Sequence, residues 1–165
     1  MTMSSPTTPD AALPQNQITE VSRGAADPGR ESHRFLDLIE AGDAALIAEI
    51  LDEDVTWVLP MSTSGDPEDG LRLDGRNAFL DRLRQLGGVT ESMRFASRRV
   101  SVTRDETTTF VQAAGDFVTS TGVSYRNTYV FRLDWREGQL VSMEEYANPV
   151  AVQRAYPGFD EGGGE

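Results

Sequence analysis

The chain has 165 residues, with 15 Lys and Arg against 27 Asp and Glu, and it contains no cysteine. The lack of cysteine excludes disulfides, thiolate metal sites and cysteine nucleophiles, and a single histidine, His33, cannot build a multi-histidine metal site. A net charge of −12 argues against nucleic acid and anionic membranes as partners, because both reward basic surfaces.

Composition divides the chain into one domain and two terminal segments. Residues 1–30 are rich in Pro, Ser, Thr, Ala and Gly and show no apolar period, and residues 157–165 are similar. We predict a flexible N-terminal extension over 1–30, a domain over 31–156 and a flexible acidic tail over 157–165. Residues 1–30 lack a basic start followed by an apolar run, and no apolar stretch is long enough to cross a bilayer. We therefore expect a cytoplasmic protein that does not enter membranes.

The first half of the domain shows helical periodicity. Apolar residues repeat at helical spacing over 31–41, and Gly42 supplies a left-handed stop. A second helix begins at the N-cap Asp43, with an apolar stripe that extends to Leu51. Residues 55–59 read as a strand that ends at Pro60.

The second half changes from helical to alternating periodicity. Residues 61–75 are a loop of turn formers, part of which (65–74) would be either a lid or an ordinary connection. A third helix covers 76–86 and stops at Gly87-Gly88. Four strands follow at 93–103, 107–119, 123–133 and 139–146, and their short connections predict an antiparallel meander. The fold class is α+β: three N-terminal helices on a curved antiparallel sheet that encloses one pocket.

Alternation along the strands predicts which side chains face this pocket. With a tight turn at 119–122, residues whose numbers sum to about 241 lie opposite each other, and side chains at even spacing share a face. A one-residue error in this turn would move Asp116 to the other face. In the last strand we expect Met143 to point inward, and Glu145 lies on the same face because it is two residues further along. The predicted concave face of the hairpin carries Phe110, Gln112, Asp116, Tyr125, Asn127, Tyr129 and Phe131.

This face is apolar and aromatic, with a few polar groups, and such a mixture suits a small apolar or amphipathic organic molecule. We predict Glu145 as a partly desolvated general acid or base, and Asp116 as a second acid. A strand carboxylate paired with an arginine or exposed at the rim is the alternative for Glu145. The predicted ligand contacts are Tyr129, Asn127, Trp57, Tyr125, Gln112, Leu59, Phe35, Met143 and Phe131.

Three stretches carry a resemblance to a known superfamily. They are RFLDLIEAGDAALIAEILDEDVTWVLP, LDGRNAFLDRLRQL and YVFRLDWREGQLVSMEEYANPVAV, and together they span most of residues 33–155. The chain resembles SnoaL-like proteins of the nuclear transport factor 2-like superfamily, which also contains ketosteroid isomerases and limonene-epoxide hydrolases. The resemblance implies a cystatin-like cone, a homodimer formed through the outer sheet face, and chemistry without a cofactor or metal.

The catalytic residues of these relatives transfer only in part. The ketosteroid isomerase base falls on Leu59, the phenol of helix one on Phe35, and the protonated aspartate on Tyr129, so steroid isomerisation by that mechanism is not expected. The two acids of the epoxide hydrolases fall on Glu145 and Asp116, but their arginine falls on Ala114. An acid–base carboxylate of SnoaL-type cyclases falls on Glu145.

Two functions follow from this comparison. The first is a cofactor-free acid–base enzyme, acting as a cyclase, isomerase, dehydratase or epoxide hydrolase on a mostly apolar ligand. The second is a non-catalytic ligand-binding or dimerisation module of the same fold, which the missing isomerase residues favour.

Overall fold

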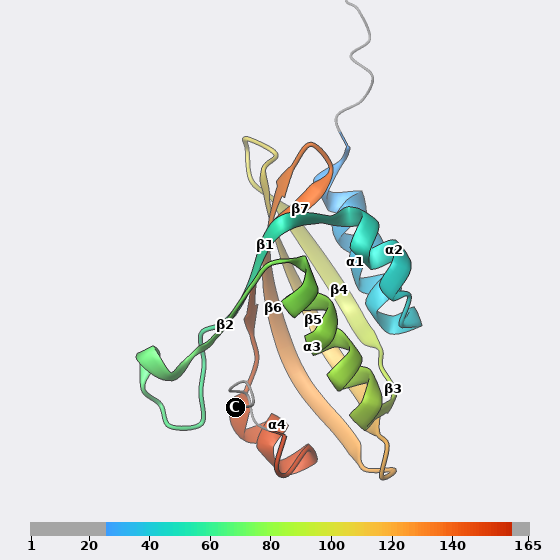
Figure 1. Cartoon of the computed structure of the whole chain (residues 1–165), viewed down its shortest axis with the longest axis vertical. Coiled ribbons are helices and arrows are strands. Elements are labelled where there is room, and N and C mark those ends of the chain that lie inside the picture. Colours follow the sequence, from blue (N-terminus) through green and yellow to red (C-terminus); the bar gives the residue numbers. More distant parts are fainter. Residues whose placement is uncertain (1–25, 160–165) are drawn as a thin grey trace, which may run out of the picture.

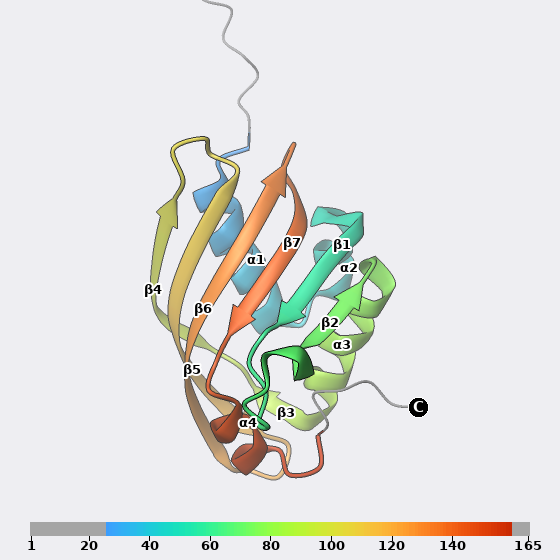
Figure 2. The same ribbon diagram turned by 90° about the vertical axis from the view of Figure 1, so that its left-hand side faces the viewer.

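The computed structural model describes residues 26–159 and shows helices packed on one face of a curved sheet (Figures 1 and 2). The predicted α+β class is confirmed. The helices are α1 (Pro28–Ala41), α2 (Ala44–Ile50), α3 (Arg76–Val89) and α4 (Pro149–Ala155), with a 3₁₀ turn at Pro67–Asp69. The strands are β1 (Leu51–Leu59), β2 (Leu71–Asp74), β3 (Thr90–Ser92), β4 (Phe95–Val102), β5 (Thr108–Thr119), β6 (Ser124–Arg136) and β7 (Gln139–Tyr146).

The sheet is mixed, whereas the sequence predicted an antiparallel one. Its order is β2-β1-β7-β6-β5-β3, with β4 also paired to β5. The strands from β4 to β7 form the expected antiparallel meander, but β1 lies parallel to β7. A parallel pair needs a long connection, and here everything between β1 and β7 supplies it.

Helix α1 begins earlier than the helix predicted over 31–41. Helix α1 starts at Pro28, three residues inside the segment expected to be a flexible extension. Asp27 caps it by accepting a hydrogen bond from the Gly29 amide at 2.9 Å, and Pro at the first helical position favours the start. Gly42 ends the helix at φ +68, as expected. Residues 1–25 of the predicted extension and 160–165 of the predicted tail lie outside the described residues.

Several boundaries differ from the pattern-based expectation. Leu51 opens β1 and is fully buried, so the apolar stripe that looked helical runs into a strand. Helix α3 continues through Gly87 to Val89, because the tertiary position of the helix outweighs the weak propensity of glycine. The expected strand over 93–103 corresponds to β4, which covers Phe95–Val102. The short elements β2, β3 and α4 were missed.

The β5–β6 hairpin has a register one residue away from the predicted one. Val118 pairs with Ser124, and Asp116 with Arg126. The Thr119 amide donates to the Val123 carbonyl, which leaves a three-residue loop ending at Gly122 with φ +80. A glycine in the left-handed region is characteristic of three-residue hairpin loops, whereas the prediction assumed a two-residue turn.

This shift inverts the predicted faces of β5 and leaves those of β6 unchanged. Val111, Ala113 and Phe117 are buried on the concave side. The predicted inward positions of Asp116, Gln112 and Phe110 are therefore wrong: all three are on the outer face, where Phe110 is 41% exposed. Asp116 forms an ion pair with Arg126 at 3.1 Å. The inward positions of Tyr125, Tyr129 and Phe131 are confirmed by their burial.

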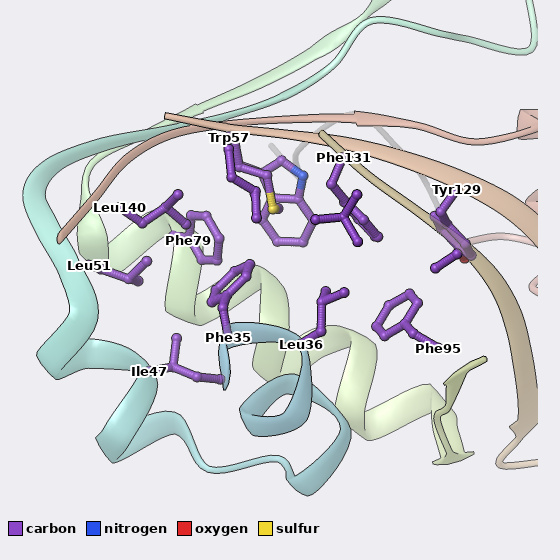
Figure 3. Close-up of a cluster of buried hydrophobic side chains, with 14 of the residues drawn as sticks. Phe35, Leu36, Ile47, Leu51, Trp57, Phe79, Phe95, Tyr129, Phe131 and Leu140 are labelled. Atoms are coloured by element: carbon purple, nitrogen blue, oxygen red, sulfur yellow. The ribbon is translucent and has the colours of Figure 1, made fainter. Parts of the chain in front are cut away.

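Aromatic side chains dominate the core between the sheet and the helices (Figure 3). At one end Phe79 of α3 packs between Phe35 and Trp57, with ring centroids 6.2 and 4.7 Å away. At the other end Phe95 packs edge-on against Tyr129 and Phe131, each at 5.4 Å. These contacts leave a hollow on the concave side, beyond Trp57.

Candidate ligand pocket

A pocket of about 80 Å³ lies between the sheet, α3 and α4. The sheet contributes aromatic side chains, α3 contributes Leu83 and Leu86, and α4 contributes Pro149 and Val152. Seven of the residues predicted to form the site line this pocket: Glu145, Tyr129, Tyr125, Trp57, Leu59, Met143 and Phe131. Their proposed roles stay predictions.

The remaining predicted site residues lie elsewhere. Asp116 and Gln112 are on the outer face, as the hairpin register requires. Phe35 is fully buried in the core behind the pocket, against Phe79, and does not line it. Asn127 is on the concave side but lies just outside the pocket, and its amide is used within the protein.

Glu145 brings a carboxylate into a mostly apolar wall, which also contains the buried Arg82 of α3. Strand β7 places it opposite Phe131 of β6, two residues after the buried Met143. Among the described residues, it is the one carboxylate that lines the pocket. Its side chain is half-buried, so it reaches both the pocket and its mouth.

Two tyrosine hydroxyls form a pair beside this carboxylate. The hydroxyls of Tyr125 and Tyr129 are 2.9 Å apart, and the Asn127 side-chain amide donates to the Tyr125 hydroxyl at 2.6 Å. One of the two hydroxyl protons lies between the oxygens, so the other remains available as a donor. The pair is therefore a hydrogen-bond donor held in place by an amide.

The electrostatics of the pocket keep this pair protonated. Burial raises the pKa of Tyr129 far above its ordinary value, and the negative charge of Glu145 raises it further. Burial also raises the pKa of Tyr125, although its hydrogen bonds with Tyr129 and Asn127 partly offset the shift. Both phenols are consequently donors, and neither is a base, at neutral pH.

Trp57 supplies a second donor. Its side chain is 3% exposed, and its indole N–H has no hydrogen-bond partner within residues 26–159. Figure 3 shows the indole nitrogen on the side of the ring that faces Phe131. A buried donor without a partner costs about 1–3 kcal/mol, so a water or a ligand acceptor is expected there.

The C-terminal segment closes one side of the pocket. Tyr156 and Phe159 line it, and the Arg82 guanidinium lies 4.3 Å from the centroid of the Phe159 ring. Asn127 exchanges two hydrogen bonds with the backbone of Asn148, each 3.1 Å long, which anchors the start of α4. The sequence analysis missed Arg82, Tyr156 and Phe159. Asn148-Pro149 is an N-cap followed by a first-turn proline and could have predicted the helix that carries Tyr156 to the pocket.

Neither a metal centre nor a membrane span emerges from the described part of the chain. Within residues 26–159, no three histidine, cysteine or acidic side chains gather as a metal site would require. None of the helices in that range has the length and apolar character needed to cross a bilayer.

The sequence of residues 32–143 matches the model of the SnoaL-like domain family. The chain belongs to this family. SnoaL-like membership confirms the resemblance seen in the three sequence stretches. The chain is also 25% identical over 126 residues to the uncharacterized protein YesE of Bacillus subtilis strain 168, an alignment that covers 76% of this chain and 84% of YesE.

Solved structures agree on the fold of this SnoaL-like domain. A putative isomerase from Bacillus subtilis superposes with a TM-score of 0.70 at 22% identity, over 82% of this chain and 96% of that one. A putative polyketide cyclase from Xanthomonas campestris superposes with a TM-score of 0.68 at 18% identity, over 79% and 97%. At these identities the similarity shows the fold, and the activity has to be argued from the pocket.

Proposed function

We propose that this protein is a cofactor-free acid–base enzyme that acts on a small, neutral, mostly apolar ligand carrying a carbonyl oxygen. Glu145 is the acid–base residue, and the donors are the Tyr125–Tyr129 pair and the Trp57 N–H. The observation that carries this proposal is the presence of one carboxylate and two kinds of protonated donor in the same apolar pocket.

The chemistry needs no other group. The Glu145 carboxylate removes a proton from the carbon beside the carbonyl, and the donors stabilise the negative charge that develops on the oxygen. If a double bond is conjugated with the enolate, its far carbon takes the proton back from Glu145, which is an isomerisation. Otherwise the enolate attacks a second carbonyl of the same molecule, and the alkoxide formed there takes the proton back from Glu145, which is a cyclisation. In both cases Glu145 ends as it began. The names of the two similar structures, a putative isomerase and a putative polyketide cyclase, agree with these reactions.

Epoxide opening is less well supported. The residue expected as its second acid, Asp116, lies on the outer face and is paired with Arg126. The position expected for its arginine holds Ala114, which is exposed, although Arg82 of α3 lines the pocket. One carboxylate fits proton abstraction and return, whereas water activation together with epoxide protonation needs two acids.

Deuterium incorporation tests the proposal without knowledge of the natural substrate. Small ketones such as 2-butanone exchange the protons beside their carbonyl in D₂O when a base removes them, and NMR follows the loss of signal. We expect Glu145→Gln to lower the protein-catalysed rate by a factor of about 10²–10⁴. The matched control is Glu144→Gln, because Glu144 is the preceding residue on β7 and pairs with Arg132 at 3.0 Å on the outer face. Equal rates for the wild type and Glu145→Gln would refute the assignment.

A non-catalytic ligand-binding module is the second candidate. The site of the isomerase base holds Leu59, and the pocket keeps one acid among the described residues. This candidate predicts that the ketones bind, and that none of them exchanges protons faster than in buffer.

We also propose a homodimer formed through the outer sheet face, in the cytoplasm. Phe110 and Tyr146 are exposed on this face to 41% and 38%, and their strands flank β6. Light scattering should give twice the mass of the chain, and Phe110→Glu should shift the protein toward the monomer. A monomer in the wild type would contradict this assembly.

A further inference from the structure

A second hollow of about 150 Å³, a groove, lies between α1, α2 and α3. It is lined by Gly42, Ala44 and Ile47 near the start of α2, and by Arg84 and Gly87 of α3. Four residues line both this groove and the pocket: Ile39, Leu83, Leu86 and Met93. The two hollows are therefore separated by a single layer of side chains.

This shared wall is apolar and easily displaced. All four side chains are half-buried, and none carries a polar group that would lose a hydrogen bond if it moved. Met93 is unbranched and adopts many shapes at low energetic cost. Rotamer changes in one or two of these side chains would join the pocket to the groove, whereas the backbone of α1 and α3 would stay in place.

The C-terminal end of α3 leaves space beside this wall. A Cβ added at Gly87 or at Gly88 would meet nothing within 4 Å. Gly87 lines the groove, whereas Gly88 lines neither hollow. Both glycines are exposed, so a side chain at Gly87 has open space beside the groove.

The small volume of the pocket indicates that a ligand extends beyond it. The pocket, at about 80 Å³, is smaller than the ~150 Å³ cavity that accommodates a benzene ring in an engineered protein core. It can hold the oxygen-bearing end of a ligand beside Glu145, but not a whole molecule of metabolite size. The apolar part of the ligand therefore has to extend out of the pocket, and the shared wall is an apolar surface against which it can pack.

We infer that the groove between α2 and α3 binds the flexible alkyl or prenyl tail of the same ligand whose carbonyl end occupies the pocket. This inference rests on the proposed function for the position of the carbonyl end. The ligand is then a neutral, long-chain carbonyl compound, threaded between α1 and α3. No charge on the tail is called for, because Arg84 at the rim already pairs with Asp81.

A chain-length series tests this tail site. The probes are 2-alkanones from 2-pentanone to 2-undecanone, and the readout is the indole N–H signal of Trp57, which is one of two tryptophans in the chain. If the tail enters the groove, each added methylene should tighten binding about fourfold, which corresponds to ~0.8 kcal/mol per buried methylene. Gly87→Phe, which fills the groove, should end this gain for the longer ketones. Gly88→Phe is the matched control and should follow the wild type.

The outcomes separate the tail site from the proposed function. If short ketones bind but the gain ends at the same length in the wild type and both variants, the groove takes no tail and the inference is overturned. If no ketone shifts the Trp57 signal, the carbonyl end is misplaced, and the proposed function falls together with the inference. A changed mass of Gly87→Phe in light scattering would assign the groove to a second copy of the chain instead.

Discussion

The phenol ring of Tyr129 lies against the backbone of Gly115, so closely that a Cβ on Gly115 would stand 2.5 Å from a ring carbon. Gly115 is on β5, two residues after Ala113, the residue paired with Tyr129. A glycine inside a strand costs stability, and it is expected where another group approaches closely. Here it makes room for one of the two hydroxyls of the pocket.

Replacing this glycine should therefore damage the pocket. Gly115→Ala forces the Tyr129 ring away from β5, and we expect a loss of about 1–3 kcal/mol in the free energy of unfolding. The Tyr125–Tyr129 hydrogen bond should weaken as well. Urea denaturation measures the first effect. Gly87→Ala is the control, because its added Cβ meets nothing within 4 Å. Its free energy of unfolding should rise by about 0.5–1 kcal/mol, because alanine is more favourable than glycine inside a helix. Equal stability of Gly115→Ala and the wild type would contradict the close approach.

Alkaline pH should unfold the protein through its buried phenols. The pKa of Tyr129 is raised in the folded state above its ordinary value of 10.0, so the folded state holds this proton more tightly. The stability that the protonated Tyr129 adds to the folded state is fully present below pH 10. It is lost as the pH rises further, and the free energy of unfolding then falls by up to about 1.4 kcal/mol per pH unit. Tyr129→Phe should make the decline between pH 10 and 11.5 shallower, as followed by denaturation at each pH. Identical slopes for both proteins would show that Tyr129 ionises freely.

Arg98 of β4 pairs with two acidic residues of α1, one exposed and one mostly buried, and their replacement compares the stability contributed by each. Arg98 bonds to Glu40 at 2.5 Å and to Asp37 at 2.6 Å, but Glu40 also accepts the Phe95 amide. The Asp37 side chain is 66% exposed, whereas that of Glu40 is 24% exposed. Glu40→Ala should cost about 1–3 kcal/mol of unfolding free energy, and Asp37→Ala less than about 1 kcal/mol. The reverse order in urea denaturation would contradict this interpretation.

The closure of the pocket by α4 depends on Asn127. Asn127→Ala removes both hydrogen bonds to the backbone of Asn148 and the donor to the Tyr125 hydroxyl. Two lost bonds of about 1 kcal/mol each should speed amide hydrogen exchange in α4 at least tenfold. The neighbouring Thr128→Ala is the control, since Thr128 is exposed on the outer face. Unchanged protection of the Tyr156 amide would show that other contacts hold the helix.

Alternation predicts which face a residue occupies within one strand, but it does not carry over from one strand to the next. Alternation within β6 and β7 placed Tyr129 and Glu145 correctly, because burial repeats every two residues along a strand. The transfer from one strand to the next depends on a single turn, and the left-handed Gly122 adds the residue that sends Asp116 outward.

Long-range contacts were beyond the reach of any local pattern. The parallel pairing of β1 with β7 joins residues that are far apart in the sequence, such as Thr56 and Ser142. Asn127 looked like a ligand contact from its place on the strand, but its amide is taken up by Asn148, in a segment that had no predicted element. Phe35, expected at the pocket, is covered by Phe79 of α3.

A crystal structure with a bound 2-alkanone such as 2-nonanone would show whether the pocket binds a carbonyl end as proposed. We expect the carbonyl oxygen within about 3.2 Å of the Tyr129 hydroxyl or the Trp57 indole nitrogen. We also expect the carbon beside the carbonyl to contact the Glu145 carboxylate. A ketone found outside the pocket, or bound with its carbonyl turned away from both donors and from Glu145, would contradict this arrangement.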